Sequence, residues 1–95
     1  MLGQRSTYSY SIEDGIACII DHDHGRSVTN DAENVISDLL KSGLNLDAMP
    51  VIYRDTAGTW DQLVVENDRF SGFRTINKES KEAAKQMALE RQRSG

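Results

Sequence analysis

Alternating aromatic and small polar residues mark the first predicted strand. In the segment STYSYSI, Tyr8, Tyr10 and Ile12 share one parity, which is typical of a strand with one buried face. The turn sequence EDG and the continuous apolar run IACIID follow. Because glycine accepts a positive φ and turn residues bound the apolar run, we expect a hairpin whose second strand is the more central one.

The segment TNDAENVISDLLKSG has the periodicity of a helix. We expect Asn30 to cap its N-terminus and Gly43 to end it in a left-handed conformation. The apolar residues recur at i, i+3, i+4, i+7 and i+8, which places them on one face of the helix. They are Ala32, Val35, Ile36, Leu39 and Leu40.

Three further strands are predicted in VIYRD, TWDQLVVE and FSGFRTI, with turns at TAG and NDR. Strands joined by such short turns form an antiparallel meander, and Gly72 indicates a bulge or a close backbone approach in the last of them. The C-terminal segment NKESKEAAKQMALERQR contains strong helix formers and a potential cap at Asn77. Its apolar face is thin, so we expect a helix there only if another surface covers that face.

The element order β-β-α-β-β-β-α predicts a single α+β domain over residues 1–95, with residues 92–95 as a disordered tail. We expect two layers: an antiparallel sheet of four to five strands, with one amphipathic helix packed on it. The C-terminal helix is expected either to lie beside the first helix or to reach another chain.

Composition and charge disfavour several functional classes. The net charge is −4 and the pI is about 5.0, unlike most nucleic-acid-binding domains. Charge is uneven, with five Lys and Arg against twelve Asp and Glu in residues 1–73 and six against three in residues 74–95. A basic tail can simply pair with an acidic body. No secretory signal or long apolar run is present, so we expect a cytoplasmic protein that does not enter a membrane.

The segment DHDHG contains the candidate ligand or metal residues His22, Asp23 and His24. Histidine titrates near neutrality and binds zinc, so a metal site or a small enzyme active site is one hypothesis. The single Cys18 lies six residues from His24, about 20 Å along an extended strand, and it sits in an apolar run where a thiol is inert. The plainer interpretation, a polar strand end that leads into a helix, is favoured. No cofactor is expected.

The segment HGRSVTND, before the predicted first helix, lacks the Gly-Lys-Ser/Thr signature of a phosphate-binding loop, so an ordinary helix start is favoured. The leading hypothesis is therefore a non-enzymatic protein-interaction or regulatory module that forms a homodimer and binds another protein. Its candidate partner-binding residues are Trp60, Lys81, Ala84, Lys85, Met87 and Ala88. For Trp60, a place in the core is the favoured interpretation in so small a domain. A third hypothesis is single-stranded nucleic-acid binding through Tyr53, Phe70 and Phe73, which the acidic body disfavours.

Overall fold

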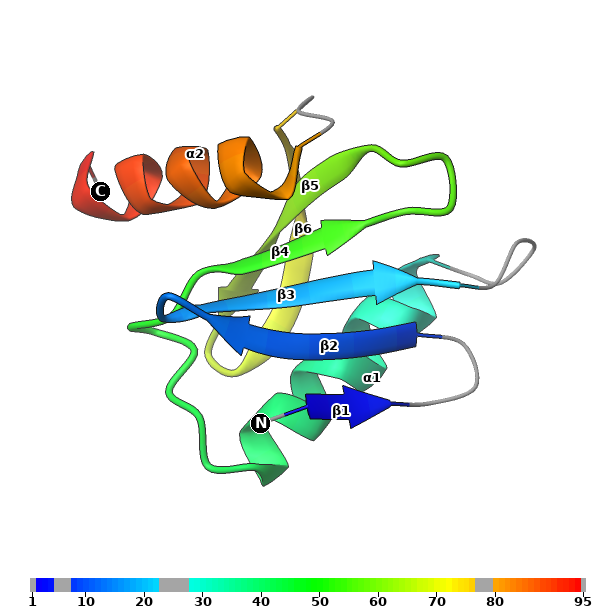
Figure 1. The fold of residues 1–95 in the computed structure, drawn as a ribbon. Helices are drawn as coiled ribbons and strands as arrows, with labels where there is room; N and C mark the ends of the chain where they lie inside the picture. Colours follow the sequence, from blue (N-terminus) through cyan, green and yellow to red (C-terminus); the bar gives the residue numbers. More distant parts are fainter. Residues whose placement is uncertain (1, 5–7, 23–27, 77–79, 95) are drawn as a thin grey trace.

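A six-stranded sheet runs through the middle of the molecule, and one helix lies on each of its faces (Figure 1). The computed structural model describes residues 2–4, 8–22, 28–76 and 80–94. In chain order the elements are β1 (Leu2–Gln4), β2 (Tyr8–Glu13), β3 (Ile16–Asp21), α1 (Val28–Lys41), β4 (Val51–Arg54), β5 (Trp60–Glu66), β6 (Arg69–Thr75) and α2 (Lys81–Ser94). The α+β class and the order of the predicted elements are confirmed, with β1 as an additional strand.

The strands lie in the sheet in the same order as in the sequence, from β1 to β6. Neighbouring strands are antiparallel except β3 and β4, which are parallel, so the expectation of a purely antiparallel sheet was wrong. The reason is the helix between them: α1 carries the chain back to the end of the sheet where β3 began. The continuous apolar runs of β3 and β4 are typical of such central strands, which are buried on both faces.

The two halves of the chain share the element order β-β-β-α, although their sequences show no repeat. The first half ends in α1 and the second in α2, and the two helices cover opposite faces. The domain therefore has three layers instead of the expected two. Helix α2 lies neither beside α1 nor on another chain, but on its own sheet, where it extends to Ser94 and includes residues expected to be a disordered tail.

The core under α1 contains the residues of one parity from the central strands. Val35 and Leu39 of α1 pack against Ile19, Val51 and Tyr53, and all five side chains are buried. This is the face that the alternating pattern of Tyr8 and Tyr10 predicted.

The core under α2 contains the residues of the other parity. Ile16, Cys18 and Ile52 lie beneath Ala84 and Ala88 of the helix. Because alanine side chains are small, the axis of α2 can approach the sheet closely. The thin apolar face of α2 is therefore enough to cover this side of the sheet.

Backbone conformations explain the turns and helix ends. Asp14 and Gly15 both have positive φ (55° and 75°), as a two-residue type I′ hairpin turn requires. Gly43 ends α1 with φ of 85°, and the Leu44 N–H donates to the Leu39 carbonyl at 3.2 Å, which completes a Schellman motif.

Both predicted N-caps differ from the structure. Helix α1 begins at Val28, so Asn30 lies inside the helix and is not its cap. Ser80 caps α2 instead, accepting a hydrogen bond from the Ala83 N–H at 3.4 Å, and Asn77 lies outside the described residues. The bulge predicted at Gly72 is confirmed, because Val64 pairs with Gly72 while Val65 pairs with Phe70.

Candidate functional site

The histidine-rich segment follows β3, and only its first residues are described. His22 is exposed, and its Nε2 lies 2.9 Å from the Ser9 Oγ on the neighbouring strand. Asp23 and His24 lie outside the described residues, so the metal or ligand site at His22, Asp23 and His24 stays a prediction. Within the described ranges, no three His, Cys, Asp or Glu side chains are grouped closely enough to hold a metal ion.

A buried polar network lies on the α1 side of the sheet, at the carboxyl ends of the parallel strands. The Tyr53 hydroxyl of β4 donates a hydrogen bond to Asp21 at the end of β3, and both side chains are buried. The Tyr8 hydroxyl donates to Asp38 of α1 at 2.6 Å. The first bond ties β4 to β3, and the second ties β2 to α1. Sequence reasoning missed the Tyr53–Asp21 contact because it depends on the parallel pairing of β3 with β4.

The residues predicted to bind a partner through α2 are mostly covered by this chain itself. Ala84 and Ala88 have no exposed surface, and Trp60 of β5 is only 2% exposed beneath the helix. The interpretation of Trp60 as a core residue agrees with this placement. Met87 and Lys81 are half-buried. The alanine stripe is thus occupied by the sheet, which removes the main reason for expecting this helix face to bind another protein.

The lysines of α2 form ion pairs with the turn between β2 and β3. The Lys85 Nζ lies 2.7 Å from Asp14 and 3.5 Å from Glu13, and the Lys81 Nζ lies 2.9 Å from Glu13. Its hydrogen bond to Asp14 raises the pKa of Lys85, and the hydrogen bond from Lys81 lowers the pKa of Glu13. Here the basic tail does pair with the acidic body. The Lys85 side chain is only 6% exposed, so it is positioned to attach α2 to the hairpin and not to meet a partner.

Cys18 lies in the core under α2 and is 2% exposed. Burial raises its thiol pKa to about 11, so the thiolate is disfavoured near neutral pH. The expectation of an unreactive buried thiol agrees with this environment.

Strand β6 forms an edge of the sheet with an exposed aromatic side chain. Phe73 is 36% exposed, the one large apolar side chain of the described chain that reaches this exposure. Its ring makes edge-to-face contacts with Phe70, at 5.0 Å between centroids, and with the buried Tyr53, at 6.0 Å. Because Tyr53 is fully buried, it contributes no exposed ring to the base-stacking surface considered for nucleic acid.

The backbone of β6 is paired on one side only. The Ile76 N–H donates to the Trp60 carbonyl of β5 at 3.2 Å. Backbone groups alternate in direction along an antiparallel strand, so those of Arg74 point toward β5 and those of Phe73 and Thr75 point outward. No strand of the described sheet lies beyond β6. The outward N–H and C=O of Phe73 and the outward N–H of Thr75 are therefore open to a strand from another molecule, whereas the Thr75 carbonyl accepts a hydrogen bond from Arg91 of α2 at 3.0 Å.

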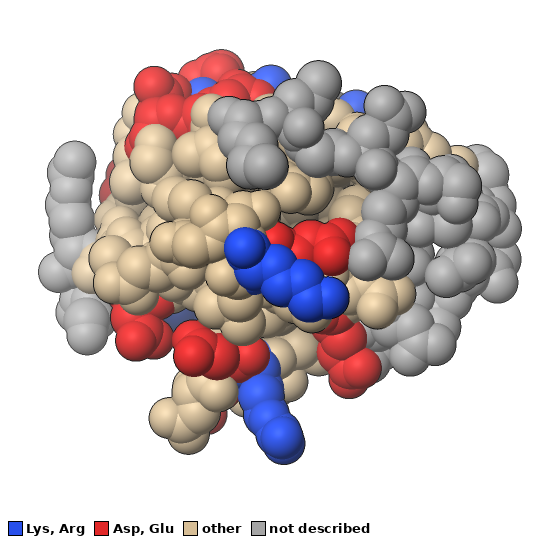
Figure 2. Space-filling model, turned by 90° about the horizontal axis from the view of Figure 1, so that it is seen from below, with Lys and Arg blue, Asp and Glu red and all other residues tan. Residues whose placement is uncertain are grey.

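A groove of about 450 Å³ separates the start of β6 from α1. Ile36, Leu40 and Phe70 supply its apolar walls, and the rest of the lining is Glu33, Ser37, Asp68 and Arg69. Figure 2 shows a view from below, where acidic side chains are scattered over a largely uncharged surface and few basic ones project. The apolar wall at Phe70 touches Phe73, so the groove and the strand edge form one continuous surface, which we call the β6 surface.

Comparisons with protein-family models, with curated proteins and with solved structures give no match for this chain. Among the helices of the described ranges, neither α1 nor α2 is long and apolar enough to cross a membrane.

Proposed function

We propose that the protein is a non-enzymatic interaction module that forms a homodimer by pairing β6 with β6 of a second copy. The observation that carries the proposal is the edge position of β6, where the N–H and C=O of Phe73 and the N–H of Thr75 point outward next to the exposed Phe73 ring. Strand addition to an open sheet edge is a common mode of protein recognition, in which backbone hydrogen bonds supply affinity and side chains supply specificity.

An antiparallel pairing centred on Phe73 is compatible with the sequence of β6. It places Phe73 opposite its own counterpart, where the two residues exchange backbone hydrogen bonds and their rings lie on the same face. Arg74 then lies opposite Gly72, and Thr75 lies opposite Ser71, so no like charges face each other. Self-pairing in this register extends the sheet across a two-fold axis.

We expect the association to be weak. Burying the exposed part of one Phe73 ring contributes about 1–2 kcal/mol, and each backbone hydrogen bond adds about 0.5–1.5 kcal/mol. Association costs roughly 4 kcal/mol or more in lost translational and rotational freedom. The dimer is therefore expected to dissociate on dilution, and the bulge after Phe70 limits the length of the new ladder.

The test is sedimentation velocity over a wide concentration range, with two variants of β6. Phe73→Asp places like charges opposite each other, and Thr75→Pro removes an outward N–H without a loss of bonding to β5. Both are expected to stay monomeric, whereas the control Thr75→Val keeps the N–H and should associate like the original chain. Circular dichroism checks that each variant is folded. A wild-type chain that is monomeric at every concentration, or a folded Phe73→Asp variant that still dimerises, would contradict the proposal.

A further inference from the structure

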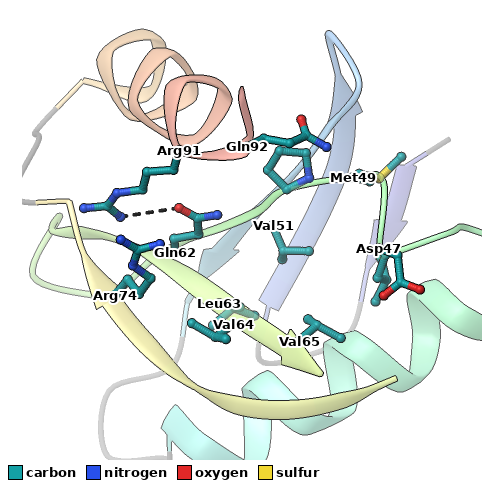
Figure 3. Close-up of a pocket in the computed structure, with 12 residues that line it drawn as sticks. Asp47, Met49, Val51, Gln62, Leu63, Val64, Val65, Arg74, Arg91 and Gln92 are labelled. Atoms are coloured by element: carbon teal, nitrogen blue, oxygen red, sulfur yellow. Dashed lines mark hydrogen bonds between the residues drawn. The ribbon is translucent and has the colours of Figure 1, made fainter. Parts of the chain in front are cut away.

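A cavity of about 200 Å³ lies at the end of the sheet where β4 begins (Figure 3). Val51, the first residue of β4, pairs with Leu63 of β5. Strand β5 continues to Glu66, so its last three residues extend beyond the start of β4. The segment 46–50 and the C-terminal half of α2 border the space that this difference in length leaves open.

The walls of the cavity are held in place by side-chain hydrogen bonds. The Gln92 side chain of α2 donates to the Ala48 carbonyl at 2.6 Å, which ties the helix to the segment before β4. Arg91 donates to the Thr75 carbonyl at 3.0 Å and to Gln62 at 3.4 Å, which ties the same helix to β5 and β6. The cavity therefore has a defined shape, with apolar lining from Met49, Pro50, Val51, Leu63, Val64 and Val65.

Two arginines lie next to each other at one end of the cavity. Arg74 of β6 pairs with Gln62 of β5, and Arg91 bonds to the same glutamine, so both guanidinium groups lie beside Gln62 (Figure 3). In the part of the chain that the structure describes, neither arginine forms an ion pair; the pairs found are those of Lys81 and Lys85. Asp47, the one acidic residue of the lining, lies at the opposite end in Figure 3.

This arrangement of charge favours a bound anion. Two neighbouring guanidinium groups repel each other, and an anion between them would offset that repulsion. Guanidinium groups match the geometry of a carboxylate, because each can donate two parallel N–H bonds. The apolar lining next to them suits a short hydrocarbon chain attached to that carboxylate.

We propose that the cavity binds a small monocarboxylate with a short apolar chain, the carboxylate between Arg74 and Arg91 and the chain against Val51 and Val64. The volume supports a small ligand, because 200 Å³ is below the roughly 300–1,000 Å³ of pockets that hold nucleotide- or drug-sized molecules. The cavity is lined from both faces of the sheet, because Val51 and Leu63 belong to the core under α1 whereas Arg91 comes from α2. The proposal is argued from this lining and does not use the pairing through β6.

The first test is a titration of the full-length chain with hexanoate, followed by nitrogen-edited NMR of backbone and side-chain amides. Saturable shifts at the side-chain amides of Gln62 and Gln92 are expected, with none for hexanol, which has the same chain and no charge. Inorganic phosphate serves as the probe for a non-selective anion site. Shifts that lie elsewhere, or phosphate and hexanoate that bind equally well, would overturn the proposal.

The second test uses matched arginine variants. Arg74→Gln should weaken hexanoate binding at least tenfold, because it removes a charge-assisted hydrogen bond. Arg69→Gln, on the same strand but outside the cavity, should change the affinity less than twofold. Equal effects of the two variants would contradict the site. The carboxylate could belong to a small molecule or to the C-terminus of a peptide. Titration with a short apolar peptide that has a free C-terminal carboxylate, and with the same peptide as a C-terminal amide, distinguishes these two sources.

Discussion

The packing of α2 on its own sheet can be tested at Ala84. This side chain has no exposed surface and lies against the core under α2 that contains Ile16, Cys18 and Ile52. The substitution Ala84→Leu adds three carbons where the helix and the sheet are in contact. If the alanine stripe were instead a free surface for a partner, the same change would leave the stability of the isolated chain unaltered.

The magnitude follows from the degree of burial. Inserting extra methylene groups into a packed interface costs typically about 1–3 kcal/mol. A matched change on the same helix, Gln86→Leu, lies at an exposed position and should alter the free energy of unfolding by less than about 0.5 kcal/mol. At about 1.4 kcal/mol for each factor of ten, a loss of 2 kcal/mol raises the population of the open state about 30-fold.

Cys18 provides the assay, because it is the single thiol of the chain and is 2% exposed beneath α2. Alkylation with iodoacetamide under native conditions reports how often the helix leaves the sheet. Urea unfolding of the same variants gives the global stability. We expect Ala84→Leu to lower stability and to speed alkylation tens-fold, with Gln86→Leu close to the original chain. Equal alkylation rates in the two variants would refute the packing of α2 on this face.

Two further predictions concern polar contacts. The hydrogen bond from Lys81 lowers the pKa of Glu13 in the folded chain below its usual value of 4.5. The Glu13 carboxylate therefore stabilises the fold at pH values above 4.5, and this contribution is lost as the pH falls through the lowered pKa of the folded state. Glu13→Gln should therefore flatten the acid limb of stability against pH in urea titrations. Tyr53→Phe removes a donor to the buried Asp21 and should cost about 1–3 kcal/mol by urea unfolding. Tyr10→Phe is the control, since no hydrogen bond of its hydroxyl is found within the described ranges; equal losses would contradict the reasoning.

The elements were predictable from local patterns because each pattern has a local cause. Alternation gave β2, the helical spacing gave α1, and the turn residues Asp14 and Gly15 gave the first hairpin. Even so, α1 begins at Val28, earlier than predicted. Asn30 resembles an N-cap, and the residues before it do not extend the apolar spacing that predicts the helix. Local patterns also did not predict β1, a strand of only three residues.

The arrangement of the elements was less predictable because it depends on contacts between distant residues. The continuous apolar runs of β3 and β4 indicate central strands, but they do not show which strand each one pairs with. The same holds for α2: an alanine stripe can pack on a sheet or on another helix. The charges contained a usable signal, since Lys81 and Lys85 are spaced by one helical turn and the turn at Glu13 and Asp14 is doubly acidic.

The placement of α2 changes where binding surfaces are expected. With its alanines on the sheet and its lysines on the β2–β3 turn, the helix face once considered for a partner is used inside the chain. The two binding surfaces proposed here lie where strand pairing stops. At β6 the sheet ends with unpaired backbone groups next to Phe73, which suits a strand. At the start of β4 the shorter strand leaves a cavity beside Arg74 and Arg91, which suits a small anion.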